Sequence, residues 1–300
     1  MQKPSEKTEK MLLVNTEKEV FDAVVPLNHP FRKLNDLIDW SELFAPIAKC
    51  YSSTGTPGID VEKGVKALLI QFWEDYSDRE MEKCTRENFA VRWFCGWGLV
   101  EATPDYSYFS KLRKRIGAKR IAELFNRIND ILEGYGLFGN VFTFIDASTI
   151  ITKTALWEER DHAIRDGAEK LNNTNVHKYA ADNDARWGAK SKKHIWFGYK
   201  RHVSVDMRHG LIKKVAVTPA NVPDFKTVKS IAPQQGAVFM DKMYDTKKTD
   251  AILRGMGIHT ATIRKNNNRT KNRDLDRWRS GIRMPFEGII DLLPFNIRRT

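Results

Sequence analysis

Apolar residues recur at helical spacing along the first third of the chain. They fall every three or four positions, and polar residues suited to helix starts, such as Asp60 and Ser77, interrupt the periodic runs. Ser77 and Glu80 have the spacing of a capping box. The pattern predicts an all-α domain over residues 26–138, preceded by a loose, charged tail over residues 1–25.

The pattern changes beyond residue 139 to short runs of β-branched and aromatic residues. The predicted strands are 141–145, 194–206, 211–219, 236–240 and 258–263, and the predicted helices are 223–231 and 245–254. The polar segment 152–193 is expected to be a surface excursion, and residues 207–210 a hairpin turn. This order of elements is that of an RNase H-like fold. Residues 139–300 are therefore predicted to form an α/β domain, a mixed sheet with flanking helices.

Three of the predicted core elements carry a carboxylate. Asp146 and Asp241 each follow an apolar strand, and Glu287 lies among apolar neighbours near the end of the chain. Converging carboxylates are the ligands that Mg²⁺ prefers, and a two-metal site can act on a phosphodiester. An aspartate at a strand end is also common as a turn or helix-cap residue, so each acid alone leaves both interpretations open.

Composition excludes several environments for the protein. Of the 300 residues, 41% are hydrophobic and 29% charged, and no apolar run reaches the ~18 residues of a membrane span. The first residues lack the apolar segment of a secretory signal. Cys50, Cys84 and Cys95 show no metal-site or disulfide spacing, and we expect reduced thiols. The sequence thus predicts a cytoplasmic protein with no membrane partner.

A net charge of +12 favours a polyanionic partner. Many of the basic residues fall in two segments, the helix that begins near residue 106 and a loop that leads to Glu287. The candidate DNA contacts are Lys111, Arg113, Lys114 and Arg115 in the first segment, and Arg264, Lys265, Arg269, Lys271, Arg273, Trp278 and Arg283 in the second. Basic helices and loops are also often only solvated surfaces, and Trp278 suits either base stacking or anchoring of the loop.

Several motifs together resemble the DDE transposases of bacterial insertion sequences, in the group usually numbered five. The similar segments are HPFRKL (29–34), PGID (57–60), LLIQFW (68–73), YSDRE (76–80) and RWFCG (92–96) in the first half, and DARWG (184–188), WFGYKRH (196–202), TPANVPD (218–224) and DKMYD (241–245) in the second. The resemblance covers most of the chain.

The resemblance implies a catalytic triad of Asp146, Asp241 and Glu287, at spacings of 241 − 146 = 95 and 287 − 241 = 46 residues. It implies two Mg²⁺ ions, with Mn²⁺ as a substitute, and endonuclease and strand-transfer activity with water or a DNA 3′ end as nucleophile. The implied partners are double-stranded DNA, as terminal inverted repeats and target, and a second copy in a homodimer at the nucleoid. Arg283 is expected to touch phosphate.

Two departures from that family keep an alternative open. Met243 stands where the family usually has glycine, and the residues after Glu287 include Pro294 and read as a truncated end. An inactive DNA-binding remnant of a transposase is therefore the alternative, and a repair or defence nuclease of the same fold is a weaker one. The nearby residues Asp206, Asp224, Asp245 and His202 are expected to be structural.

Overall fold

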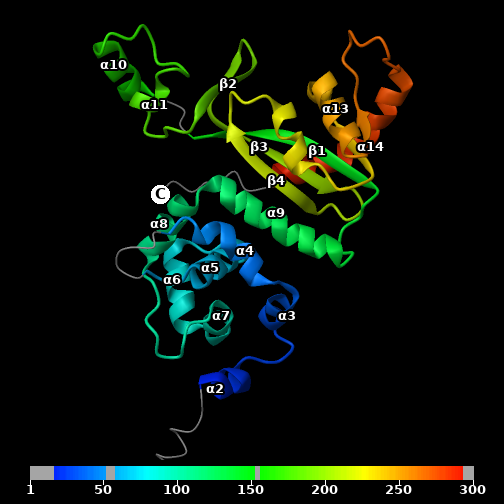
Figure 1. Cartoon of the computed structure of the whole chain (residues 1–300). Helices are drawn as coiled ribbons and strands as arrows, with labels where there is room; N and C mark the ends of the chain where they lie inside the picture. Colours follow the sequence, from blue (N-terminus) through cyan, green and yellow to red (C-terminus); the bar gives the residue numbers. More distant parts are fainter. Residues whose placement is uncertain (1–16, 52–57, 153–155, 293–300) are drawn as a thin grey trace, which may run out of the picture. The chain divides into compact units, whose positions relative to one another are not determined.

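The computed structural model describes residues 17–51, 58–152 and 156–292, with side chains to residue 288. The chain divides into two compact units at Ile121, and the described residues form only helices before this point and the sheet with further helices after it (Figure 1). Residues 293–300, with Pro294, lie outside the described residues. The domain boundary that the sequence predicts at residue 138 stays a prediction. None of the described helices is long and apolar enough to span a bilayer.

The first unit is built from short helices around an aromatic core. Trp40 stacks on Phe44 and meets Phe94 edge to face, and Phe94 is 1% exposed. The predicted capping box is present, because Ser77 accepts from the backbone N–H of Glu80 and the Glu80 carboxylate accepts from that of Ser77. The helices are α2 (Glu17–Val24), α3 (Pro30–Leu37), α4 (Trp40–Ala48), α5 (Val61–Trp73), α6 (Asp78–Glu87), α7 (Phe89–Cys95) and α8 (Tyr106–Ile116).

Helix α2 differs from the loose tail that the sequence predicts for residues 1–25. The helix is too short for its apolar periodicity to show in the sequence. The buried side chain of Phe21 and contacts from Arg32, which lies beyond the helix, hold it in the fold. The Arg32 guanidinium donates to the carbonyl of Val25 and to the carboxylate of Asp22. A tertiary contact, which local pattern does not reveal, therefore orders the end of the predicted tail.

The strands form one mixed sheet in the order β4–β3–β1–β5–β6. Strand β3 runs antiparallel to both β1 and β4, whereas β1, β5 and β6 are parallel. Strand β2, which the sequence analysis did not predict, pairs with the first part of β3. The strands are β1 (Phe142–Ile151), β2 (Arg186–Ser191), β3 (His194–Asp206), β4 (Ile212–Pro219), β5 (Ala237–Met240) and β6 (His259–Thr262). The predicted RNase H-like α/β fold with a preceding helical region is confirmed.

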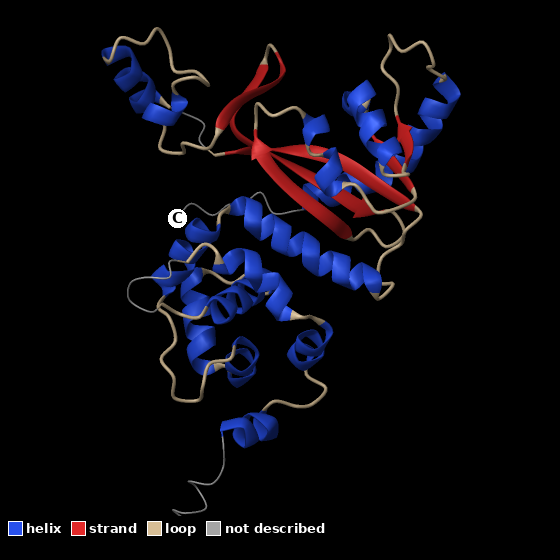
Figure 2. Ribbon diagram, in the orientation of Figure 1, coloured by secondary structure: helices blue, strands red, loops and turns tan. Residues whose placement is uncertain are grey.

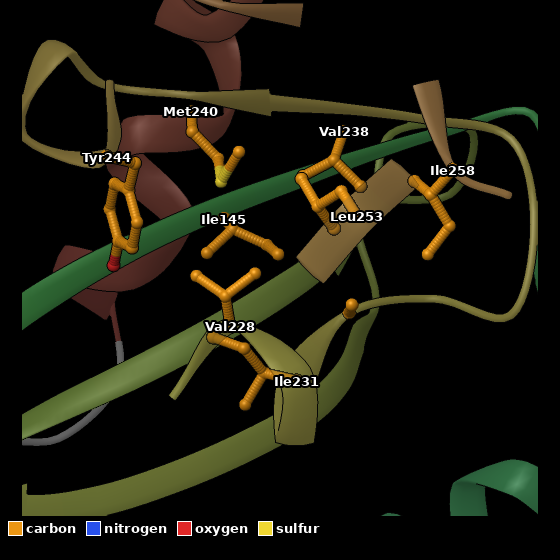
Figure 3. Close-up of a cluster of buried hydrophobic side chains, with 9 residues drawn as sticks. Ile145, Val228, Ile231, Val238, Met240, Tyr244, Leu253 and Ile258 are labelled. Atoms are coloured by element: carbon orange, nitrogen blue, oxygen red, sulfur yellow. The ribbon is translucent and has the colours of Figure 1, made fainter. Parts of the chain in front are cut away.

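Helices cover both faces of this sheet (Figure 2). On one face, α12 (Val228–Ile231) and α13 (Lys247–Gly255) pack on Ile145, Val238 and Met240, all of them less than 1% exposed (Figure 3). On the other face, Phe286 of α14 (Arg273–Leu292) packs against the cluster of Phe144, Val203 and Val205. Side chains alternate between faces along a strand, so Asp146 shares the face of Phe144.

The segment 152–193 is more ordered than the predicted surface excursion. It contains α10 (Trp157–Arg165), α11 (Val176–Tyr179) and the strand β2. Leu156, Val176 and Phe197 contribute to a small core of its own. The sequence of this segment is mostly polar because a core of this size needs few apolar residues.

Helix α9 (Ala118–Gly134) closes the free edge of β4 with side-chain amides. Asn126 donates to the Val215 carbonyl at 2.9 Å and accepts from the Val215 N–H at 2.7 Å, as a neighbouring strand would. Asn129 donates to the carbonyls of Ile212 and Lys213. The Lys213 ammonium, 2% exposed, pairs with Glu133 at 2.7 Å.

Replacing Asn126 by alanine should destabilise the sheet, because both backbone groups of Val215 lose their partner. We expect the free energy of unfolding to fall by about 1–2 kcal/mol, measured by urea denaturation of the full chain. Lys229→Ala, at an exposed position of the same unit, is the control and should change it by less than about 0.5 kcal/mol. Equal stability of the two variants would show that the amide does not hold the edge.

Candidate active site

Strand pairing brings the first two candidate carboxylates together. The parallel register of β1 and β5 ends with Ile145 opposite Met240, so Asp146 and Asp241 are the next residues on adjacent strands. Asp146 does not end its strand, as the sequence analysis expected, because β1 continues to Ile151 along β3. Asp146 lies on β1 just beyond the last residue that pairs with the shorter strand β5.

Asp241 begins the 3₁₀ turn η2 (Lys242–Tyr244), and its side chain accepts from the backbone N–H of Lys242. Met243, which stands where the resembled family has glycine, is 61% exposed in this turn. Among the described non-glycine residues only Asp75 has a positive φ, so Met243 adopts the turn without left-handed strain. The departure at Met243 therefore does not distort the backbone after Asp241.

Helix α14 supplies Glu287. The helix begins at Arg273, so the second half of the predicted basic loop is helical, a difference that follows from the apolar positions Trp278, Ile282 and Phe286 at helical spacing. Phe286 packs against the sheet and fixes the helix turn that carries Glu287, whose side chain is about half exposed.

Arg283 joins the carboxylates of two elements. The buried side chain lies over the ring of Phe144, with its guanidinium 3.1 Å from Glu287 Oε1 and 3.7 Å from Asp241 Oδ1. Arg283 is only 4% exposed, and in this arrangement its guanidinium contacts protein carboxylates. The predicted role of Arg283 in touching phosphate thus stays a prediction.

The three carboxylates share one electrostatic environment. Burial raises the pKa of Asp146, and the negative charges of Asp241 and Glu287 raise it further. The Ala147 N–H, which donates to Asp146 Oδ1 at 2.8 Å, and the Arg283 guanidinium act in the opposite direction. A carboxyl group on this strand therefore holds its proton more firmly than one in water.

The donor chemistry of these three residues fits a hard divalent cation, since all the candidate ligand atoms are carboxylate oxygens. Within the described part of the chain, however, no three carboxylate, histidine or cysteine side chains gather closely enough to hold a metal ion. Arg283 lies between two of the acids and supplies positive charge there. Metal binding at this site would need the side chains of Glu287 and Arg283 to adjust.

Tyr244 lies beside the same site and was given no role in the sequence analysis. Its hydroxyl is buried without a hydrogen-bond partner, and burial together with the charges of Asp224, Asp146 and Asp241 raises its pKa well above the usual value. The signal in the sequence was the tyrosine of the segment DKMYD, a polar ring within an apolar core (Figure 3).

The other polar residues near the site have structural partners. Burial lowers the pKa of His202 to about 4, and its neutral ring contacts the Thr218 hydroxyl at 3.0 Å. Asp224 pairs with Lys200 at 2.6 Å. Asp206 accepts from backbone N–H groups, one of them that of Gly139, and from His209, while Asp245 holds Arg264, Lys265 and Asn268.

The basic candidates of α8 differ in their availability. Arg113 makes a two-fold ion pair with Asp78, at 2.7 and 2.8 Å, and also donates to Gln71. Arg115 is exposed and lies over the ring of Tyr51. Lys111 and Lys114 are exposed, and the Lys111 ammonium contacts the Ser107 hydroxyl. Arg113 is therefore engaged within the helical unit.

In the second basic segment, too, some cations are paired with acids and others are exposed. Arg264 pairs with Asp245 at 2.8 Å and Asp250 at 3.3 Å, and the Lys271 ammonium donates to the carbonyl of Arg264. These contacts tie the loop to α13. The exposed members of the segment are Arg269, Arg273 and Trp278, whose ring is 54% exposed and also meets Phe239 at its inner edge.

Comparison with protein families identifies two matching regions. Residues 138–289 match the family described as Transposase DDE domain, and residues 19–115 match Transposase domain (DUF772). The first region contains all three candidate carboxylates. Among solved structures, the Mos1 mariner paired end complex with Mn is 11% identical, with 97% of this chain and 95% of that chain covered, but its TM-score of 0.19 is too low to inform the fold.

The raised pKa of Asp146 predicts that its charge destabilises the fold. A carboxyl whose pKa is raised on folding stabilises the folded state while protonated and loses that contribution as pH rises through the folded pKa. Asp146→Asn keeps an oxygen for the Ala147 N–H, and we expect the free energy of unfolding at pH 7 to rise.

Urea denaturation at pH 7 and near pH 4 tests this expectation. The gain should shrink at the lower pH, where the unmodified carboxyl is increasingly protonated. Asp274→Asn, on a side chain that is 94% exposed, is the control and should leave the midpoint unchanged. An Asp146→Asn variant that is less stable at pH 7 would contradict the electrostatic account.

Proposed function

We propose a function for this chain, which belongs to the DDE transposase family. It binds the terminal inverted repeats of an insertion sequence and catalyses divalent-metal-dependent cleavage and transfer of DNA strands. The observation that supports this most is the grouping of Asp146, Asp241 and Glu287 around Arg283. The three acids come from β1, the turn after β5, and α14, so the fold gathers residues that are distant in sequence.

The assignment gives the carboxylates the role of metal ligands. Asp146, Asp241 and Glu287 would hold two Mg²⁺ ions or their Mn²⁺ substitutes, which supply Lewis acidity to the attacking and leaving oxygens of a phosphodiester. Asp146 lies on β1 and Asp241 directly follows β5, and backbone pairing fixes the register of these two strands, so the separation of the two acids is preorganised. Glu287 is the adjustable member, because its side chain is half exposed on a helix.

The proposed reaction is in-line phosphoryl transfer. In cleavage, a water oxygen bonds to phosphorus as the P–O3′ bond breaks, and the products carry a 3′-hydroxyl and a 5′-phosphate. In transfer, that 3′-oxygen bonds to a target phosphorus, and the target O3′ leaves with a proton. Arg283 is a positioning residue in this scheme, since its ion pairs orient Asp241 and Glu287.

DNA binding is assigned to the exposed members of the two basic segments. These are Lys111, Lys114 and Arg115 on α8, and Arg269, Arg273 and Trp278 near α14. Exposed cations favour phosphate backbones by counterion release, and Trp278 offers a face for a base. We assign Arg113 and Arg264 to the protein scaffold because their ion pairs would have to break before they reached DNA.

Asp241→Asn tests the catalytic assignment. The amide keeps the shape but binds divalent cations poorly, so cleavage of duplex ends with Mg²⁺ should fall at least about 10³-fold while DNA binding persists. Asp274→Asn on α14 is the matched control and should cleave normally. Equal cleavage by Asp241→Asn would refute the assignment, and binding with no cleavage by the unmodified protein, with Mg²⁺ or Mn²⁺, would favour the inactive DNA-binding alternative.

Arg283→Gln tests the grouping of charges. Removal of the buried cation leaves the acids unpaired, so we expect a loss of about 3 kcal/mol in the free energy of unfolding, and Mg²⁺ should restore more stability to this variant than to the unmodified protein. Thermal unfolding with and without Mg²⁺ measures both effects. Arg277→Gln, whose side chain is 85% exposed, is the control, and an equal Mg²⁺ shift in all three proteins would contradict the expectation.

A further inference from the structure

The β2–β3 hairpin carries an exposed basic tip that belongs to neither predicted basic segment. All residues from Ala189 to Ile195 are exposed, and Lys190, Lys192 and Lys193 lie at the turn. The sequence has no acidic residue from 185 to 205. Among the described residues, none of the ion pairs involves these three lysines. The tip is therefore a local concentration of available positive charge.

This tip is rigidly mounted at its base. Asn173 donates to the Trp187 carbonyl at 3.0 Å and accepts from the Trp187 N–H at 2.7 Å, so the outer edge of β2 is closed. A Cβ at Gly188 would lie only 2.7 Å from Ala220, which shows that β2 packs tightly on the chain after β4. Phe197 anchors the other strand in the small core under the hairpin.

The hairpin is an arm of defined length rather than a mobile loop. Figure 2 shows it projecting beyond the rest of the sheet, and β3 runs without interruption from its turn to the residue that pairs with Asp146. That residue is Val203, so 203 − 193 = 10 residues separate Lys193 from the register of Asp146. At about 3.3 Å per residue, ten residues of extended strand span at most roughly 33 Å, close to one turn of B-DNA at about 34 Å.

From this charge, rigidity and reach we propose that Lys190, Lys192 and Lys193 grip the phosphate backbone of duplex DNA about one helical turn from the phosphate that is cut. The proposal rests on the proposed function. A two-stranded ribbon fits the width of a DNA groove, and lysines at its turn meet the flanking phosphates. Exposed Ile195, 58% accessible beside the turn, adds an apolar contact for the sugar edge.

The test compares a variant with all three tip lysines changed to alanine with the unmodified protein. The probe is a duplex three to four helical turns long that carries DNA flanking this reading frame. Loss of up to three phosphate contacts should lower the slope of log K against log salt by up to about 2.7, and should remove backbone protection about one turn from the cleavage site.

Two matched variants separate a local grip from a general effect of charge. Lys229, Lys247 and Lys248, exposed elsewhere in the same unit, are changed together to alanine and should leave the distal protection intact. Arginine at the three tip positions should restore both the slope and the protection. Circular dichroism checks that every variant is folded.

The outcomes distinguish a failure of the hairpin assignment from a failure of the proposed function. If the unmodified protein cuts the duplex and the tip variant keeps the full salt slope and the distal protection, the hairpin assignment is wrong and the proposed function stands. If the two triple variants weaken binding equally, with no loss confined to one turn away, the grip is refuted in the same way. If the unmodified protein neither binds nor cuts the duplex, the proposed function fails, and the hairpin assignment fails with it.

Discussion

Repulsion among three partly buried carboxylates is the constraint on which the second unit depends. Asp146 is forced beside Asp241 by strand register, and Glu287 is brought to them by the packing of Phe286. Arg283 offsets this repulsion from a buried position against Phe144. The apolar clusters on both faces of the sheet supply the free energy that keeps these like charges together.

The sequence predicted every strand except β2, because the signals of these strands are local. The run before Asp146 and the alternation from residue 194 to 219 each belong to one element, and the structure confirms the resulting α/β fold. The roles of the acids as ligands remain predictions. Contacts between distant segments were not visible in the pattern: α2 depends on Arg32, and β2 depends on Asn173. Insertion-sequence group five likewise stays a prediction.

The basic residues show why charge patterns alone could not define the DNA surface. Arg113 and Arg264 look in the sequence like their exposed neighbours, yet each forms ion pairs with aspartates far along the chain. Their partners, Asp78 and Asp245, carry no sequence mark of this pairing. Conversely, the lysines of the β2–β3 turn fell within a segment whose polarity suggested only surface. Ion pairs in the folded protein decide which cations are available for a ligand. Some residues of the two dense basic segments are therefore engaged, whereas the lysines of a less conspicuous segment are available.

The amide ladder of α9 has a consequence for how copies of this chain can associate. An open strand edge invites the strand of a neighbouring molecule, which is a common route to unwanted aggregation. Asn126 and Asn129 already satisfy the outward backbone groups at Val215, Ile212 and Lys213. A second copy cannot extend the sheet there without displacing the helix, so this edge of the sheet is closed to strand pairing between copies.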